Sequence, residues 1–361
     1  MKPLSLSRPF QIASALLALG LGAVTSAHAQ SAPLPPALRA AVMSGNSQQI
    51  AQAIAVLSGG NPAQAAALAS SVVSAAERLV ATNPRAAVAV AQAAVQAIQS
   101  NGVQSAAPTQ IQSVLTTAAR IFVNPQVTQA DPEGAASLAT ATVQASTATN
   151  NPALTAQIAT QATTTAESIL ASNPSAAVQV ASAAVNAVNS TSVTSASPSA
   201  ALQVATTASR IIANPSAQAA SPSVVGQIAS AVATVAATPA VYQTSPSAAI
   251  AVMSNAYAAA SSSPVSATGP SALVSVTQTL TQAQASNGLN ASNSSNSAQI
   301  AAILKPSPQG QAGPNTQPTA NPDSSTNQQN TQNQQNNSNP TNNSGTPTVD
   351  PTQSTSPAGP R

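Results

Sequence analysis

Few residues in this chain could carry out chemistry. Of its 361 residues, nine are Lys or Arg, six are Asp or Glu and one is His. Cysteine is absent, so the chain has no thiolate nucleophile, no disulfide and no cysteine metal site. The single histidine, His28, stands near the N-terminus. Hydrolysis would therefore depend on carboxylates acting as general acid and base.

The positions of the carboxylates argue against such a pair. Glu77 and Glu167 occupy matching positions of an internal repeat, so each belongs to a different repeat unit. Asp131 and Glu133 stand at the start of a predicted helix, where negative charge is favoured by the helix dipole. We therefore predict that the protein is not an enzyme and that it has no catalytic, cofactor-binding or metal site.

The first 29 residues predict a secretory signal peptide. Lys2 and Arg8 precede a short apolar stretch over 13–24, and Ala27-His28-Ala29 has the form of an A-x-A cleavage site. Cleavage after Ala29 would remove His28 and both early cations. Seven basic and six acidic residues would remain, which gives a net charge of +1. We expect a secreted, periplasmic or cell-surface protein with no membrane span after signal cleavage.

The low charge also restricts the partners. Charged residues make up 4% of the chain, and its arginines are scattered singly. Nucleic-acid binding needs clustered Lys and Arg to displace counterions from phosphates, so we expect no nucleic-acid partner. Self-association, or a cell-surface or matrix partner, remains open.

The middle of the chain is an internal repeat with a shift of 90 residues. The stretch NPRAAVAVAQAAV at 83–95 recurs as NPSAAVQVASAAV at 173–185, and TTAARIFVNP at 116–125 recurs as TTASRIIANP at 206–215. Inside this unit, prolines begin similar segments of 20 to 24 residues. These starting prolines are Pro62, Pro84, Pro108, Pro132, Pro152, Pro174, Pro198, Pro222, Pro246 and Pro270.

Each segment predicts a helix. In eight of the ten, the residue before the proline is Asn, Asp or Ser, which can accept a hydrogen bond from the first turn. Proline is favoured at the next position, because its missing N–H would lack a partner there anyway. The sixth residue after every starting proline is Val, Leu or Ile, and positions +3, +6, +10 and +13 share one helical face.

The predicted fold is all-α: an Ala-rich antiparallel helical repeat array with a disordered C-terminal tail. The period suits an α-solenoid, but tandem four-helix bundles would fit it equally. We divide the chain into a signal peptide (1–29), an N-terminal helical cap (30–60), two repeat units (61–150 and 151–240), a partial third unit (241–285) and the tail (286–361). The tail is rich in Asn, Gln, Ser, Thr and Pro and cannot bury enough apolar surface to order itself.

The repeat also predicts two structural ion pairs. Helices i and i+2 of an antiparallel array run parallel, which places Glu77 and Arg120 at similar heights. Glu167 and Arg210 repeat this arrangement one unit later. We expect Glu77 to pair with Arg120 and Glu167 to pair with Arg210.

Composition and repeats favour an exported structural or surface-interaction protein. The alternative is a solenoid binding module that docks a peptide or polysaccharide, although the aromatic and charged anchors typical of such grooves are few. A third possibility is contact with ice or mineral through Ser, Thr and Ala rows. The two late aromatic residues, Tyr242 and Tyr257, are interpreted as core or helix-edge residues.

Overall fold

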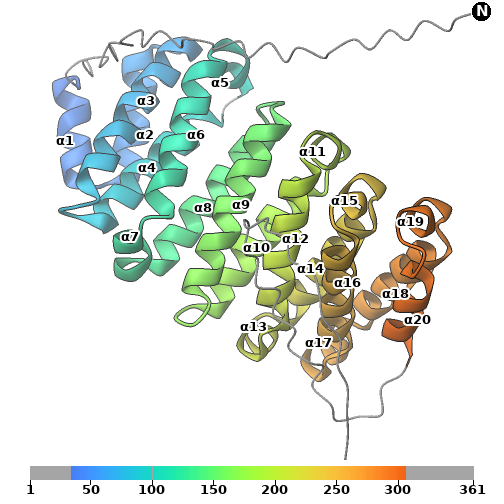
Figure 1. The fold of residues 1–361 in the computed structure, drawn as a ribbon. Helices are drawn as coiled ribbons and strands as arrows, with labels where there is room; N and C mark the ends of the chain where they lie inside the picture. Colours follow the sequence, from blue (N-terminus) through green and yellow to red (C-terminus); the bar gives the residue numbers. More distant parts are fainter. Residues whose placement is uncertain (1–33, 100, 306–361) are drawn as a thin grey trace, which may run out of the picture. The chain divides into compact units, whose positions relative to one another are not determined.

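The structure is a computed structural model that describes residues 34–99 and 101–305 (Figure 1). Every regular element in this part of the chain is a helix. The predicted all-α helical array is therefore confirmed. The predicted signal peptide and the tail from residue 306 onward lie outside the described residues.

All ten starting prolines are the first residues of long helices, as predicted, because proline fits the first helical position. These helices are α3 (Pro62–Leu79), α4 (Pro84–Ile98), α6 (Pro108–Phe122), α8 (Pro132–Thr147), α9 (Pro152–Ile169), α10 (Pro174–Val188), α12 (Pro198–Ala213), α14 (Pro222–Ala237), α16 (Pro246–Ser261) and α18 (Pro270–Ala285). Two further helices, α1 (Pro36–Ser44) and α2 (Ser47–Ser58), fall in the predicted N-terminal cap.

The residues before the starting prolines differ in whether they cap the helix. The asparagines and the aspartate before the prolines accept hydrogen bonds from the first turn; for example, Asn173 Oδ1 accepts from the Ala176 N–H at 3.1 Å. Ser197, Ser221 and Ser245, which were expected to act in the same way, make no such bond. Asp131 has nearly the same backbone angles as Ser221, yet its carboxylate reaches the Gly134 N–H at 2.9 Å. The serine hydroxyl is one atom shorter than the carboxylate, and at these backbone angles it makes no bond to the first turn.

The predicted apolar face forms the core. Nine of the ten aliphatic residues at position +6 are buried, and the tenth, Leu68, is partly buried against the core. Three threonines interrupt the same face at +3, +10 or +13, and all three are buried. Thr142 shows how they are tolerated: its hydroxyl donates to the Leu138 carbonyl at 2.7 Å. A β-branched polar residue therefore replaces an aliphatic one without leaving an unpaired donor.

Seven six-residue helices, which the sequence analysis did not predict, connect most of the long ones. They are α5 (Asn101–Ala106), α7 (Pro125–Ala130), α11 (Thr191–Ala196), α13 (Pro215–Ala220), α15 (Pro239–Thr244), α17 (Ser263–Thr268) and α19 (Asn287–Ser292). The third residue of each is apolar and buried. Six of the seven end two residues before a starting proline, because proline disfavours helical geometry in the residue that precedes it.

The long helices form two layers. Each packs against the next long helix along the chain and against the one after that. One layer holds α3, α6, α9, α12 and α16, and the other holds α4, α8, α10, α14 and α18. Short helices at the same end of the array also touch, as α15 does with α11 and α19 (Figure 1). The contacts continue across residues 150–151 and 240–241, so the array is continuous and corresponds to the solenoid-like alternative, not to separate bundles.

The array extends beyond the predicted boundary at residue 286. The short helix α19 and the helix α20 (Asn296–Leu304) follow, and α20 packs on α18 and α16. The tail prediction was therefore wrong for these first 20 residues. Leu289 and Ile300 are buried and supply the apolar contacts, while Asn296 is buried and fully hydrogen-bonded. Because residues 286–305 are rich in Asn and Ser, their composition did not predict these two helices.

Candidate functional site

Both predicted pairs of charges lie in contact, and both join neighbouring helices of one layer. Arg120 Nε on α6 lies 3.1 Å from Glu77 Oε1 on α3. Arg210 Nη2 on α12 lies 3.0 Å from Glu167 Oε1 on α9. All four side chains are about half exposed. At that exposure such a pair contributes only about 0–1 kcal/mol to the free energy of unfolding.

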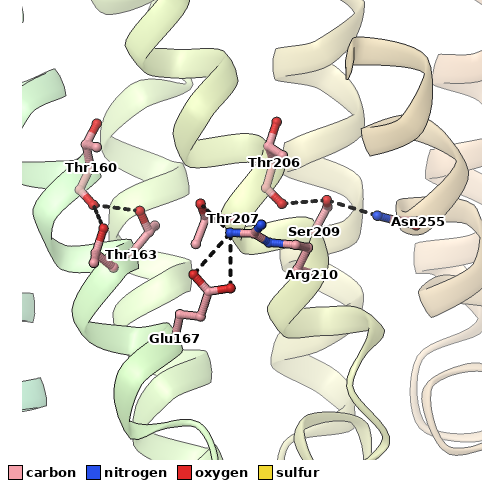
Figure 2. A network of polar contacts seen from close by, with 9 residues as sticks. Thr160, Thr163, Glu167, Thr206, Thr207, Ser209, Arg210 and Asn255 are labelled. Atoms are coloured by element: carbon pink, nitrogen blue, oxygen red, sulfur yellow. Dashed lines mark hydrogen bonds and ion pairs between the residues drawn. The ribbon is translucent and has the colours of Figure 1, made fainter. Parts of the chain in front are cut away.

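The surroundings of the two pairs are also repeated. Arg120 Nη2 donates to Thr117 Oγ1 at 3.2 Å, and Arg210 Nη2 donates to Thr207 Oγ1 at 3.5 Å. Figure 2 shows that polar contacts continue to the next helix of the layer, where Asn255 Nδ2 on α16 donates to Ser209 Oγ at 3.3 Å. These contacts tie α9, α12 and α16 together.

The remaining acidic residues of the first unit have structural positions. Asp131 caps α8 through the Gly134 N–H, and Glu133 is exposed in the first turn of that helix. In the described part of the chain, no group of three or more His, Cys, Asp or Glu side chains is placed to hold a metal ion. Over the same residues, no helix is long and apolar enough to cross a membrane.

The two tyrosines have different surroundings. Tyr242, in α15, is fully buried, and its hydroxyl donates to Asn296 Oδ1 at 2.8 Å. The same hydroxyl accepts from Asn293 Nδ2 at 3.1 Å. Burial raises the pKa of Tyr242, while the hydrogen bond from Asn293 opposes the shift. Tyr257 is half-buried against the core.

The structure reveals a polar row that the sequence analysis missed. It consists of the residues twelve positions after the starting proline on the five helices of the α4 layer, and all five are exposed. The members of this polar row are Gln96, Gln144, Asn186, Thr234 and Gln282. The recurrence of a polar residue at this position can be found in the sequence, but only by comparing every second segment. Alternate segments form helices of different layers.

Grooves lie along the polar row. Gln144 lines a groove of about 290 Å³ between α8 and α10. Together with Asn186 it lines a second groove, of about 520 Å³, beside the start of α9. Gln96 lines the equivalent groove one repeat earlier, of about 470 Å³, and Thr234 lines one of about 530 Å³ between α14 and α18. The linings consist mainly of small apolar residues, amides and hydroxyls, and Glu133 is their one charged residue.

Comparisons with protein-family models, with curated proteins and with solved structures return no match to this chain.

Proposed function

We propose that this protein is an exported, non-enzymatic structural or surface-interaction protein. The observation that carries the proposal is the continuous two-layer array with few charged side chains on its faces, in which four of the charges neutralise one another in two pairs. An array of this kind presents a long, regular surface with little electrostatic preference. The predicted signal peptide supports export, and the sparse acid, base and nucleophile inventory supports the absence of catalysis.

Export and assembly state test this proposal together. The full-length chain is expressed in a secreting host, and its location and molecular mass are measured. The expected result is a protein processed after Ala29 and recovered outside the cytoplasm, on the cell surface or as an assembly. A variant with Ala27→Glu and Ala29→Glu blocks the cleavage site and is the matched control. An unprocessed wild-type chain retained in the cytoplasm would contradict the proposal.

A second candidate function, a binding module for a peptide or polysaccharide, is favoured by one observation. Four grooves accompany the polar row, and two of them occupy equivalent places in successive repeats. Repeated grooves suit a linear polymer, because each repeat unit of the protein can meet an equivalent part of the polymer. Binding of a neutral glycan or peptide that is lost on Gln144→Ala with Asn186→Ala would favour this function.

A further inference from the structure

The exposed large apolar side chains gather at the two ends of the array. Among residues 34–99 and 101–305 they are Met43 on α1, Val56 on α2 and Val274 on α18. The helices α1 and α2 begin the two layers, whereas α18 and α20 end them (Figure 1). The end repeats of a solenoid normally carry a polar outer face, which keeps the protein soluble. Apolar side chains at both ends therefore point to a contact there.

The open face of α18 is the one that earlier helices of its layer use to bind the next helix. The residues four and eleven positions after the starting proline are buried on α4, α8, α10 and α14. On α18 the same positions hold Val274 and Thr281. Both are exposed, because no described helix of this layer follows α18.

Two observed contacts set the register between neighbouring helices of one layer. A Cβ at position +4 of α14, Gly226, would lie 2.9 Å from the Cβ at position +2 of α18, Ala272. Position +11 of α12, Ser209, accepts a hydrogen bond from position +9 of α16, Asn255, at 3.3 Å. A helix therefore presents its positions +2 and +9 to positions +4 and +11 of the helix before it.

At the other end of the array, positions +2 and +9 of α2 are open. Counted from its first residue, Ser47, they are Gln49 and Val56, and both are exposed. In the observed register, Val274 of one chain would meet Gln49 of the next, and Thr281 would meet Val56. Neither α2 nor α18 contains a charged residue, so joining these faces strands no charge.

The other layer has half a helix at each end. The helices α1 and α20 have nine residues each, whereas α3 and α9 of that layer have 18. The helix α20 begins at the side of the array where α16 begins, since the preceding α19 touches α15. The helix α1 ends at the opposite side, where Gly45 lies beside Ala86 in the first turn of α4. One α20 and one α1 therefore fill complementary halves of a single helix position.

We propose that the chain assembles head to tail with further copies of itself. The end formed by α1 and α2 of one copy packs on the end formed by α18 and α20 of another. This interface continues the helix contacts inside the array, and α20 and α1 of two copies complete one helix position. Each joint leaves an open end on both copies, so further copies add in the same way. The inference rests on the proposed structural role and names its partner.

Single cysteines test the register, because the natural chain has none. Thr281→Cys and Val56→Cys are made separately in the chain that begins at Gln30, so the outcome does not depend on export. Under mild oxidation a disulfide-linked dimer should form much faster in the mixture than in either variant alone. Gln282→Cys, the exposed neighbour of Thr281 in the polar row, is the matched control and should not link faster with Val56→Cys. Equal rates for all samples would overturn the proposal.

Blocked ends test the same interface without a cross-link. The mass of the unchanged chain, measured by light scattering, should rise with concentration. Val56→Lys alone and Val274→Lys alone should stay monomeric, because every joint needs both faces. Their mixture keeps one intact joint and should give dimers. An unchanged chain that stays monomeric at every concentration would overturn the proposal, and so would Val274→Lys dimers, which would show symmetric pairing through the other end.

Salt should strengthen the assembly. Arg39 on α1 and Lys305, directly after α20, are the charged residues of the half-length helices and their ends in the described chain, and both are exposed. Because they have the same sign, added salt screens their repulsion between copies. A mass that falls as salt is added would contradict the placement of α1 beside α20.

Discussion

At the scale of single residues, the ion pairs show how a nearly uncharged chain uses its charges. Glu77 with Arg120 and Glu167 with Arg210 join second-neighbour helices at the same height in both repeats. Their positions could be predicted from the sequence, because charged residues are rare and their places recur after one repeat. The exposed fraction of these four side chains could not be predicted, because it depends on how closely the neighbouring helices surround them.

A double-mutant cycle on Glu167 and Arg210 measures this contact. We expect Glu167→Gln and Arg210→Gln to couple by about 0.3–1 kcal/mol in the free energy of unfolding, because the pair is half solvated. The coupling should shrink with added salt. Glu133→Gln with Arg210→Gln is the control and should be additive, since Glu133 is exposed at the start of α8. Additive losses for both cycles would show that no contact exists in solution.

A second prediction for a single residue concerns the contribution of the Tyr242 hydroxyl to stability. Tyr242→Phe removes the hydroxyl that bonds Asn296 and Asn293, which should cost about 1–3 kcal/mol by leaving buried Asn296 short of a partner. Tyr257→Phe is the control, because that hydroxyl makes no hydrogen bond within the described residues. Chemical denaturation measures both variants, and equal losses would contradict this role for Tyr242.

The raised pKa of Tyr242 determines whether the stability of the fold rises or falls with pH. The folded protein holds the phenol proton above the ordinary pKa of 10.0, whereas the unfolded chain releases it at that value. The stability contribution is therefore complete below about pH 10 and is lost as pH rises through the folded pKa. Tyr242→Phe should abolish this loss. A wild-type stability that is flat up to about pH 11 would contradict the assignment.

At the scale of elements, proline places the helix starts and small residues permit close packing. The starts and the apolar face followed from local chemistry, so they could be predicted residue by residue. The six-residue helices could not, because one apolar residue in so short a segment produces no periodicity. The serine caps were mispredicted for a related reason: residue type alone does not reveal whether a hydroxyl reaches the first turn.

Gly226 lies at a close approach between two helices that a single substitution can test. A Cβ at this position of α14 would stand 2.9 Å from the Ala272 Cβ on α18 and 3.3 Å from Val265 Cγ1. We expect Gly226→Ala to destabilise by about 1–3 kcal/mol through overpacking, despite the better helix propensity of Ala. Ala272→Gly in the same chain should recover part of the loss. Gly288→Ala has no neighbour closer than 4.0 Å and should be neutral or stabilising in the same thermal melts.

At the scale of the whole molecule, continuity is the property that the sequence left open. Ala at most contact positions permits close approach in a solenoid and in separate bundles alike. The contacts between α12 and α16 and between α14 and α18 join the second unit to the third in the same way as helices within a unit. The polar row depends on this continuity, because its members belong to successive helices of one uninterrupted layer.

One disulfide tests the continuous array most directly. Ser209 on α12 and Asn255 on α16 lie on opposite sides of the boundary between units, with their side chains 3.3 Å apart. In this cysteine-free chain, Ser209→Cys with Asn255→Cys should form an intramolecular disulfide under mild oxidation, detected by mass and by mobility on a non-reducing gel. Asn186→Cys with Asn255→Cys, whose positions lie in opposite layers, is the control and should stay reduced. A Ser209–Asn255 double variant that remains reduced while folded would contradict the continuous array.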